Sequence, residues 1–173
     1  MKRIATLLAV GAILTMPFAS FATESEAGAW FDLKNCDMCK SMSSIEGLME
    51  NMQWDNHLIA TGAVSVTSVN AGWEDKFEKA HMGMEAVGKK MAEGAAVNMC
   101  NFCKSYGACV MAGAKCENFK SPAGWVGTMT STDPAVIAQI QKHWQTTIDE
   151  YNKMMEAEKA KATAAAAASA TKK

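Results

Sequence analysis

Two cysteine pairs have the residue types and the spacing that metal binding requires. Cys36-x-x-Cys39 is followed by Lys-Ser, and the same pattern returns as Cys100-x-x-Cys103, 64 residues further along the chain. Residues three apart on a helix lie on one face, so both sulfurs of a pair can reach one ion. Thiolates are the ligands that Cu(I) and Zn(II) prefer, and the lysine after each pair favours their ionisation. The pairs therefore predict soft-metal chemistry.

Histidines and methionines extend this ligand set. The chain has fourteen methionines, and His81-Met-Gly-Met84 is the densest cluster of them with a histidine. Cysteine, methionine and histidine together suit Cu(I), whereas Zn(II) binds best where four strong ligands form a tetrahedron. We therefore expect Cu(I), with Zn(II) competing only if all four thiolates converge. This inventory is similar in residue types to that of periplasmic copper-handling proteins. The predicted metal ligands are Cys36, Cys39, Cys100, Cys103, His81, His143, Met82 and Met84.

Disulfide and redox chemistry are the alternative uses of the cysteines. In an oxidising compartment an even number of cysteines often forms disulfides, and the helical spacing puts the Cα atoms of a pair about 5 Å apart, within disulfide range. A thiol–disulfide redox protein is the other alternative. A thioredoxin-like one needs a preceding strand and a facing cis-proline, and beyond Pro17 only Pro122 and Pro134 remain. Catalysis is therefore not expected, and a binding protein stapled by disulfides stays open.

Haem and the two remaining cysteines can also be judged from spacing. Cys-x-x-Cys-Lys resembles the rare haem-attachment variant of the nitrite-reducing cytochromes c. Those proteins also carry Cys-x-x-Cys-His, which this chain lacks, so haem is disfavoured.

Cys109 and Cys116 lie seven residues apart, too far for a mutual bond on one unbroken helix, and they follow an apolar stripe. We expect both to be buried in the core.

The first residues have the features of a secretory signal. Lys2 and Arg3 precede an uncharged apolar run over residues 4–14, and Ser20-Phe-Ala22 offers a cleavage site. The run is about half of the roughly 20 residues that a membrane-spanning helix needs, and no second such stretch follows. The sequence predicts cleavage after residue 22, a periplasmic location and no membrane span in the mature chain. A net charge of −1 argues against a nucleic-acid partner.

The mature chain repeats itself at offsets of 62 to 64 residues. Besides the cysteine pairs, matches recur in one order: Gly62-x-Val64 with Gly124-x-Val126, Thr67-Ser-x-Asn70 with Thr130-Ser-x-Asp133, Phe77 with Ile140, and His81 with His143. Chance rarely produces several matches in the same order. We therefore expect two units, at about 30–93 and 94–157.

Each unit has the pattern of a helix, a hairpin and a second helix. Apolar residues spaced three and four apart over 38–52 and over 102–116 predict the first helices, and alternation around Gly62 and Gly124 predicts the hairpins. Helix-start residues at Asn70 and at Asp133-Pro134 predict the second helices. The expected fold class is α+β, with duplicated helix–β-hairpin–helix units packed as one pseudo-two-fold domain over 23–158. Residues 159–173 are expected to form a frayed alanine- and lysine-rich tail.

These expectations combine into one functional hypothesis. The sequence predicts a secreted, non-enzymatic protein that binds a soft metal, most simply Cu(I), for sequestration or delivery. The metal ion is the expected ligand, and a periplasmic partner protein would receive or supply it.

Overall fold

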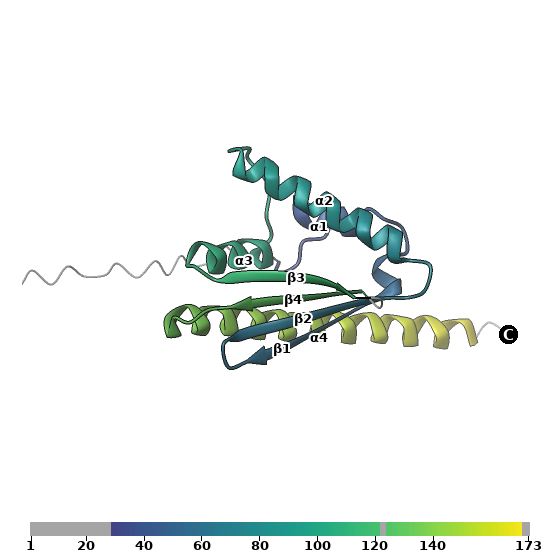
Figure 1. The fold of residues 1–173 in the computed structure, drawn as a ribbon. Helices are drawn as coiled ribbons and strands as arrows, with labels where there is room; N and C mark the ends of the chain where they lie inside the picture. Colours follow the sequence, from purple (N-terminus) through teal and green to yellow (C-terminus); the bar gives the residue numbers. More distant parts are fainter. Residues whose placement is uncertain (1–28, 122–123, 171–173) are drawn as a thin grey trace, which may run out of the picture.

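A computed structural model describes residues 29–121 and 124–170 of the 173-residue chain (Figure 1). The predicted signal segment, residues 1–22, lies outside this range. The elements in chain order are α1 (Asp37–Ser43), a short 3₁₀ turn η1 (Met49–Asn51), β1 (Met52–Ile59), β2 (Gly62–Val69), α2 (Glu74–Ala92), α3 (Asn101–Met111), β3 (Lys115–Ser121), β4 (Gly124–Thr130) and α4 (Pro134–Ala170).

The strands form one antiparallel sheet in the order β1-β2-β4-β3. The central pair, β2 and β4, aligns Val66 with Val126. Gly62 and Gly124 sit at equivalent places in this pair, with φ values of +147° and +142°. A Cβ on Gly62 would overlap the Met129 carbonyl, and a Cβ on Gly124 would overlap the Thr67 carbonyl. Glycine is therefore required at both positions for β2 and β4 to approach each other.

Two core clusters cover the same face of the sheet. Side chains two residues apart on a strand share a face, and Trp125 lies four residues before Met129. One cluster joins the sheet to α3 and α4 through Cys109, Met129, Val136, Ile140 and Trp144 with Ala63. The other buries Leu48, Phe77 and Ala80 against Trp125 of β4, Met42 of α1 and neighbouring residues of β1, β2 and the connecting segments. In Figure 1, α1 and α2 lie together above the strands, and α4 runs along the lower part of the view.

Both first helices are shorter than the apolar stripes predicted. α1 ends at Ser43, and the chain then turns at Gly47, whose φ is +77° and whose missing Cβ makes room for the Trp73 ring. Gly113, with φ +100°, ends α3 in the same way, and the Ala114 N–H then donates to the Cys109 carbonyl at 3.0 Å. Positive φ favours glycine and stops a helix at that residue. Met52 therefore begins β1, and Cys116 lies in β3.

The prediction of an α+β fold is confirmed. Across the described residues there are four α-helices and one four-stranded antiparallel sheet, and the order helix, hairpin, helix occurs twice. The superposition of the two units stays a prediction. The α4 helix continues to Ala170, and the frayed tail expected over 159–173 stays a prediction. In this part of the chain no helix is both long and apolar enough to cross a membrane.

Candidate metal centre

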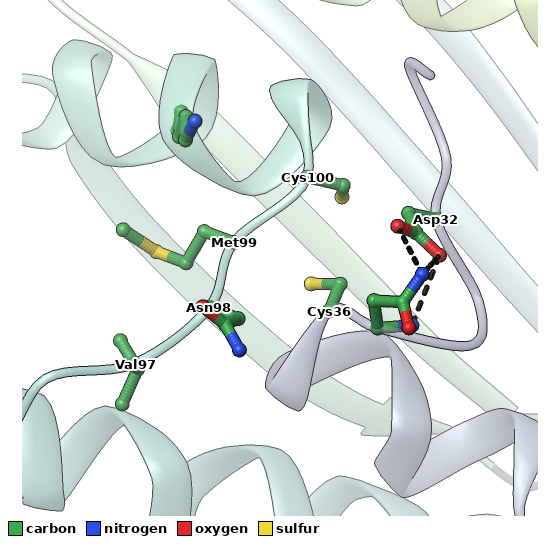
Figure 2. A pocket seen from close by; sticks show the side chains of 8 residues that line it. Asp32, Cys36, Val97, Asn98, Met99 and Cys100 are labelled. Atoms are coloured by element: carbon green, nitrogen blue, oxygen red, sulfur yellow. Dashed lines mark hydrogen bonds between the residues drawn. The ribbon is translucent and has the colours of Figure 1, made fainter. Parts of the chain in front are cut away.

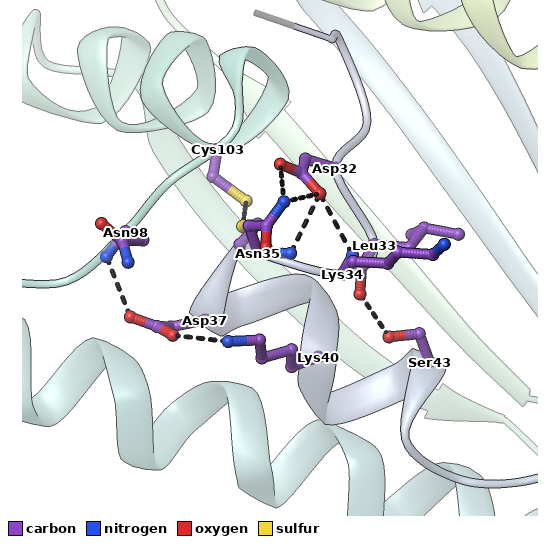
Figure 3. Close-up of polar contacts among 10 residues, drawn as sticks. Asp32, Leu33, Lys34, Asn35, Asp37, Lys40, Ser43, Asn98 and Cys103 are labelled. Carbon is purple, nitrogen blue, oxygen red and sulfur yellow. Dashed lines mark hydrogen bonds and ion pairs between the residues drawn. The ribbon is translucent and has the colours of Figure 1, made fainter.

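The starts of α1 and α3 place the four predicted cysteine ligands. Cys36 and Cys100 are the residues that precede the first turn of α1 and α3, and Cys39 and Cys103 lie one turn further along. The segment before α3 docks on the start of α1 through Asp37. The backbone N–H of Asp37 donates to the Asn98 carbonyl at 2.9 Å. The Asp37 carboxylate accepts the backbone N–H of Asn98, also at 2.9 Å (Figure 3).

A second set of hydrogen bonds fixes the loop in front of α1. The Asp32 carboxylate accepts the backbone N–H groups of Lys34 and Asn35, and the Asp32 carbonyl accepts the Cys36 N–H at 3.1 Å. Because Asn35 also donates its side-chain amide to Asp32, the pKa of that carboxyl is lowered (Figure 3). Ser43 donates to the Leu33 carbonyl at 2.6 Å. The loop before Cys36 is thereby hydrogen-bonded to both the start and the end of α1.

All four Sγ atoms lie within 4.8 Å of one another. Cys36 and Cys103 are 3.6 Å apart, Cys39 and Cys100 are 3.7 Å apart, and Cys39 and Cys103 are 4.0 Å apart. A tetrahedral ion with sulfur at about 2.3 Å has sulfur atoms separated by about 3.8 Å. These three separations bracket this value, and they exceed the about 2.05 Å of a disulfide bond; the remaining pairs lie within 4.8 Å. Four cysteines therefore converge on a space that fits one tetrahedral metal ion.

The protein shields the sulfur cluster from water. Cys36 is 1% exposed and Cys100 is 6% exposed, while Cys39 and Cys103 are half-buried. Burial strengthens the attraction between thiolates and a cation, and it makes uncompensated thiolates costly. The cluster therefore favours a bound cation over four free thiolates.

Hydrogen bonds among the crowded thiols shift their pKa values in opposite directions. Hydrogen bonds from the Cys103 and Cys39 thiols lower the pKa of Cys100, and backbone N–H groups of Asp32 and Cys103 add to this. The pKa of Cys103 is raised because its thiol donates to Cys100, and the pKa of Cys39 is raised for the same first reason. In the cation-free cluster Cys100 therefore ionises more readily than Cys39 or Cys103. A divalent ion would release the remaining protons.

The two lysines that follow the cysteine pairs have different surroundings. Lys40 lies 3.6 Å from the Asp37 carboxylate, so its charge is partly compensated. The corresponding residue before Lys104 is Asn101, which is uncharged. Within the described part of the chain no carboxylate forms an ion pair with Lys104. Lys104 therefore differs from Lys40 in having no carboxylate ion-pair partner in the described part of the chain.

The structure places His81, Met82 and Met84 on α2, and His81 is not part of the four-cysteine group. The His81 ring stacks on Trp125 with centroids 4.5 Å apart, and its Nδ1 lies 3.4 Å from the Glu85 carboxylate. Met82 is 57% exposed, and Met84 is half-buried. Among the described His, Cys, Asp and Glu side chains, the ligand group that forms consists of the four cysteines.

His143 lies in an aromatic box instead of the ligand cluster. It is 2% exposed, with Trp30, Phe102, Tyr106 and Trp144 around its ring at centroid distances of 5.1 to 6.0 Å. Neither ring nitrogen has a hydrogen-bond partner, and burial lowers the pKa of His143 to about 4. His81 and His143 therefore match in the sequence repeat but lie in different environments.

Cys109 and Cys116 differ in solvent exposure. Cys109 is fully buried in the core, where desolvation raises its pKa to about 11, as expected for a core residue. Cys116 is exposed, which contradicts the expectation, because α3 ends before it and β3 is an edge strand. Sequence reasoning also missed Asp32 and Asn98. The only signal for them in the sequence was that an Asp or Asn precedes each cysteine pair: Asp32 lies four residues before Cys36, and Asn98 lies two before Cys100.

Comparisons with protein-family models, curated protein sequences and solved structures find no match to this chain. Four cysteines that can hold one metal ion are therefore the feature from which its function has to be argued.

Proposed function

We propose that this chain is a soft-metal-binding protein in which Cys36, Cys39, Cys100 and Cys103 hold one Zn(II) ion. The observation that carries the proposal is the convergence of four Sγ atoms at neighbouring separations of 3.6 to 4.0 Å. The sequence suggested Cu(I), held by these cysteines together with histidine and methionine. Four converging thiolates meet the condition under which Zn(II) competes, because zinc favours a closed tetrahedron. Cu(I) is the second candidate, since it also prefers thiolates.

A site with four protein ligands supports a structural or storage role. Catalytic zinc usually keeps one position for water or substrate, whereas a closed set of four thiolates leaves none. The ligands come from two distant segments, so binding would hold α1, which packs on α2, against α3, which packs on α4. Binding free energy of this kind stabilises the folded chain. The proposed protein is non-enzymatic, and its predicted signal would deliver it to the periplasm.

We further infer that the site lies on the pseudo-two-fold axis of a duplicated chain. At an offset of 64, Cys36 matches Cys100 and Cys39 matches Cys103. Exchanging the two units therefore turns the Cys36–Cys103 contact into the Cys100–Cys39 contact, and the Sγ–Sγ distances in these contacts are 3.6 and 3.7 Å. At an offset of 62, the pair Gly62–Thr130 becomes Gly124–Ser68, and both pairs occur in the β2–β4 register. These reciprocal relations support a single site shared by both units.

The experiment is a metal titration of the reduced, metal-free protein with a competing chelator. Wild type should bind one Zn(II) per chain, and native mass spectrometry should report the same count. A variant with Cys36, Cys39, Cys100 and Cys103 changed to Ser should lose this binding. The control is Cys109→Ser with Cys116→Ser, which removes the two cysteines outside the cluster and should bind like wild type.

Three results would decide against zinc in this site. Unchanged affinity in the four-serine variant would place the ion elsewhere. No bound metal at any zinc concentration would remove the metal function and favour the redox alternative. Two or more tightly bound Cu(I) ions, in preference to one Zn(II), would favour the copper assignment.

A further inference from the structure

A pocket of about 460 Å³ lies beside the sulfur cluster. Its walls come from the loop before α1, the segment over 97–99 and the start of α3, and Cys36 and Cys100 lie on opposite walls (Figure 2). Cys39 and Cys103 are not among its lining residues. The pocket therefore reaches the cluster from the side of the two cysteines that precede the helices.

The pocket has the size and the polarity that a hydrated ion needs. About six water molecules around an ion occupy roughly 180 Å³, so a hydrated divalent cation fits inside. The Asn35 and Asn98 side chains line the pocket and offer amide groups to such water. An ion can therefore come close to the sulfurs before it loses its water.

The charge of the walls favours a cation. Asp32 and Lys104 are the charged side chains among the lining residues. Asp32 is half-buried and its backbone N–H donates to the Cys100 sulfur, whereas Lys104 is exposed. Solvent and salt screen an exposed charge more strongly than a partly buried one. Because the sulfurs of Cys36 and Cys100 add negative charge when they bind a metal, the pocket attracts a divalent cation.

We propose that a hydrated divalent cation enters and leaves the cluster through this pocket, where it meets Cys36 and Cys100 first and where Asp32 attracts it. The proposal rests on the proposed metal function and adds the route of the ion. Sulfur atoms replace the water molecules of the ion one after another, and each protonated thiol releases its proton to solvent. No electrons are transferred. The competing route leads past Cys39 and Cys103, which are half-buried.

Stopped-flow binding of Co(II) to the reduced, metal-free full chain tests the route, because thiolate-to-cobalt charge-transfer absorption reports binding. Asn98→Trp places a large side chain on the pocket wall. It should slow association and dissociation equally, about tenfold, which is about 1.4 kcal/mol in each barrier. A narrowed route raises both barriers and leaves the affinity unchanged. The control is Ala96→Trp, at an exposed residue that does not line the pocket, and it should bind and release Co(II) like wild type.

Charge variants test the attraction. Asp32→Asn keeps an oxygen that can accept the backbone N–H groups of the loop but loses the charge, and it should slow association about threefold at low salt. Lys104→Gln removes a like charge and should speed association about twofold. Both differences should shrink at high salt. Asp55→Asn is the control, because its exposed carboxylate on β1 does not line the pocket, and it should associate like wild type.

Single cysteine variants report which side the ion meets first. Cys100→Ser and Cys103→Ser each remove one ligand of the cluster, so both should weaken binding. Only Cys100 lines the pocket, and its replacement should therefore slow association more than that of Cys103.

The outcomes separate the route from the metal function. Bound metal is counted first by native mass spectrometry, and less than one ion per wild-type chain would count against the site itself. With one ion per chain, equal association rates for Asn98→Trp and Ala96→Trp would overturn the pocket route. Slower association of Cys103→Ser than of Cys100→Ser would place entry on the opposite side of the cluster and would also overturn it. An unchanged rate for Asp32→Asn at low salt would overturn the role of Asp32.

Discussion

The sulfurs of Cys36 and Cys103 lie 3.6 Å apart although 67 residues separate them in the chain. Their contact joins the first turn of α1 to the first turn of α3, and the contact between Cys39 and Cys100 joins the same two turns in the opposite sense. Neither half of the chain supplies four ligands. Completion of the proposed site therefore depends on the fold of the whole domain.

Metal removal should destabilise the folded protein. At free zinc a thousand times the Kd, binding adds about 4 kcal/mol, which corresponds to roughly 10 °C in Tm for a chain of this size. Calorimetry with and without a chelator under reducing conditions should show this difference in wild type. The four-serine variant should be insensitive to the chelator, and equal Tm values for the loaded and stripped wild type would contradict a structural ion.

Gly62→Ala and Gly124→Ala should destabilise the protein by similar amounts. Each added Cβ would overlap a backbone carbonyl of the neighbouring central strand at a positive φ. We expect about 3 kcal/mol from each substitution, measured by urea unfolding. Gly72→Ala is the control, because Gly72 has φ +85° but nothing within 4 Å, and it should cost only about 1 kcal/mol. Clearly unequal losses at positions 62 and 124 would count against equivalent units.

Acid should destabilise the protein through His143. The folded state holds its pKa at about 4 against an ordinary value of 6.5, because the ring is buried without a hydrogen-bond partner. The unfolded chain therefore binds the extra proton first as pH falls. The stabilising contribution is complete above pH 6.5 and is lost as pH falls toward 4, by about 3 kcal/mol in total.

Urea unfolding of wild type and His143→Phe at pH 7 and pH 5 measures this effect. The contribution of any bound metal is common to both proteins, so the difference between them isolates the histidine. Wild type should lose about 2 kcal/mol more than His143→Phe between these pH values. Parallel pH dependence of the two proteins would show that His143 is not held neutral by burial.

Thiol labelling should separate the six cysteines into three classes. In the zinc-loaded protein iodoacetamide should modify exposed Cys116 and leave buried Cys109 unmodified, since burial raises the pKa of Cys109 to about 11. The four cluster cysteines should react only after a chelator is added, because a metal-bound thiolate is a poor nucleophile. Peptide mapping by mass spectrometry gives the site of each adduct. Labelling of Cys36 or Cys100 at the rate of Cys116 in loaded protein would argue against metal ligation.

Local patterns allowed prediction of the element types and the ligand pairs. Alternation around Gly62 and Gly124 predicted both hairpins, and Asp133-Pro134 predicted the start of α4. Helix length was overpredicted because an apolar stripe continues through Gly47 and Gly113, where the backbone turns at positive φ. Periodicity contains no information about such a turn when the apolar residues after it belong to a strand.

The convergence of the cysteine pairs could not be read from spacing. It depends on long-range contacts such as the pairing of Asp37 with Asn98, 61 residues apart. The repeat also pairs two histidines whose surroundings in the structure differ. His81 packs on Trp125 at the surface of α2, while His143 is enclosed by aromatic rings under α3. Equivalent positions in sequence acquire different neighbours because the two core clusters have different side chains.

X-ray absorption at the zinc edge of the loaded protein tests the central claim most directly. One tetrahedral site built by both cysteine pairs predicts four sulfur neighbours at about 2.3 Å, with one zinc per chain. A shell of two sulfurs with nitrogen or oxygen neighbours would contradict the shared site, because each cysteine pair would then bind separately.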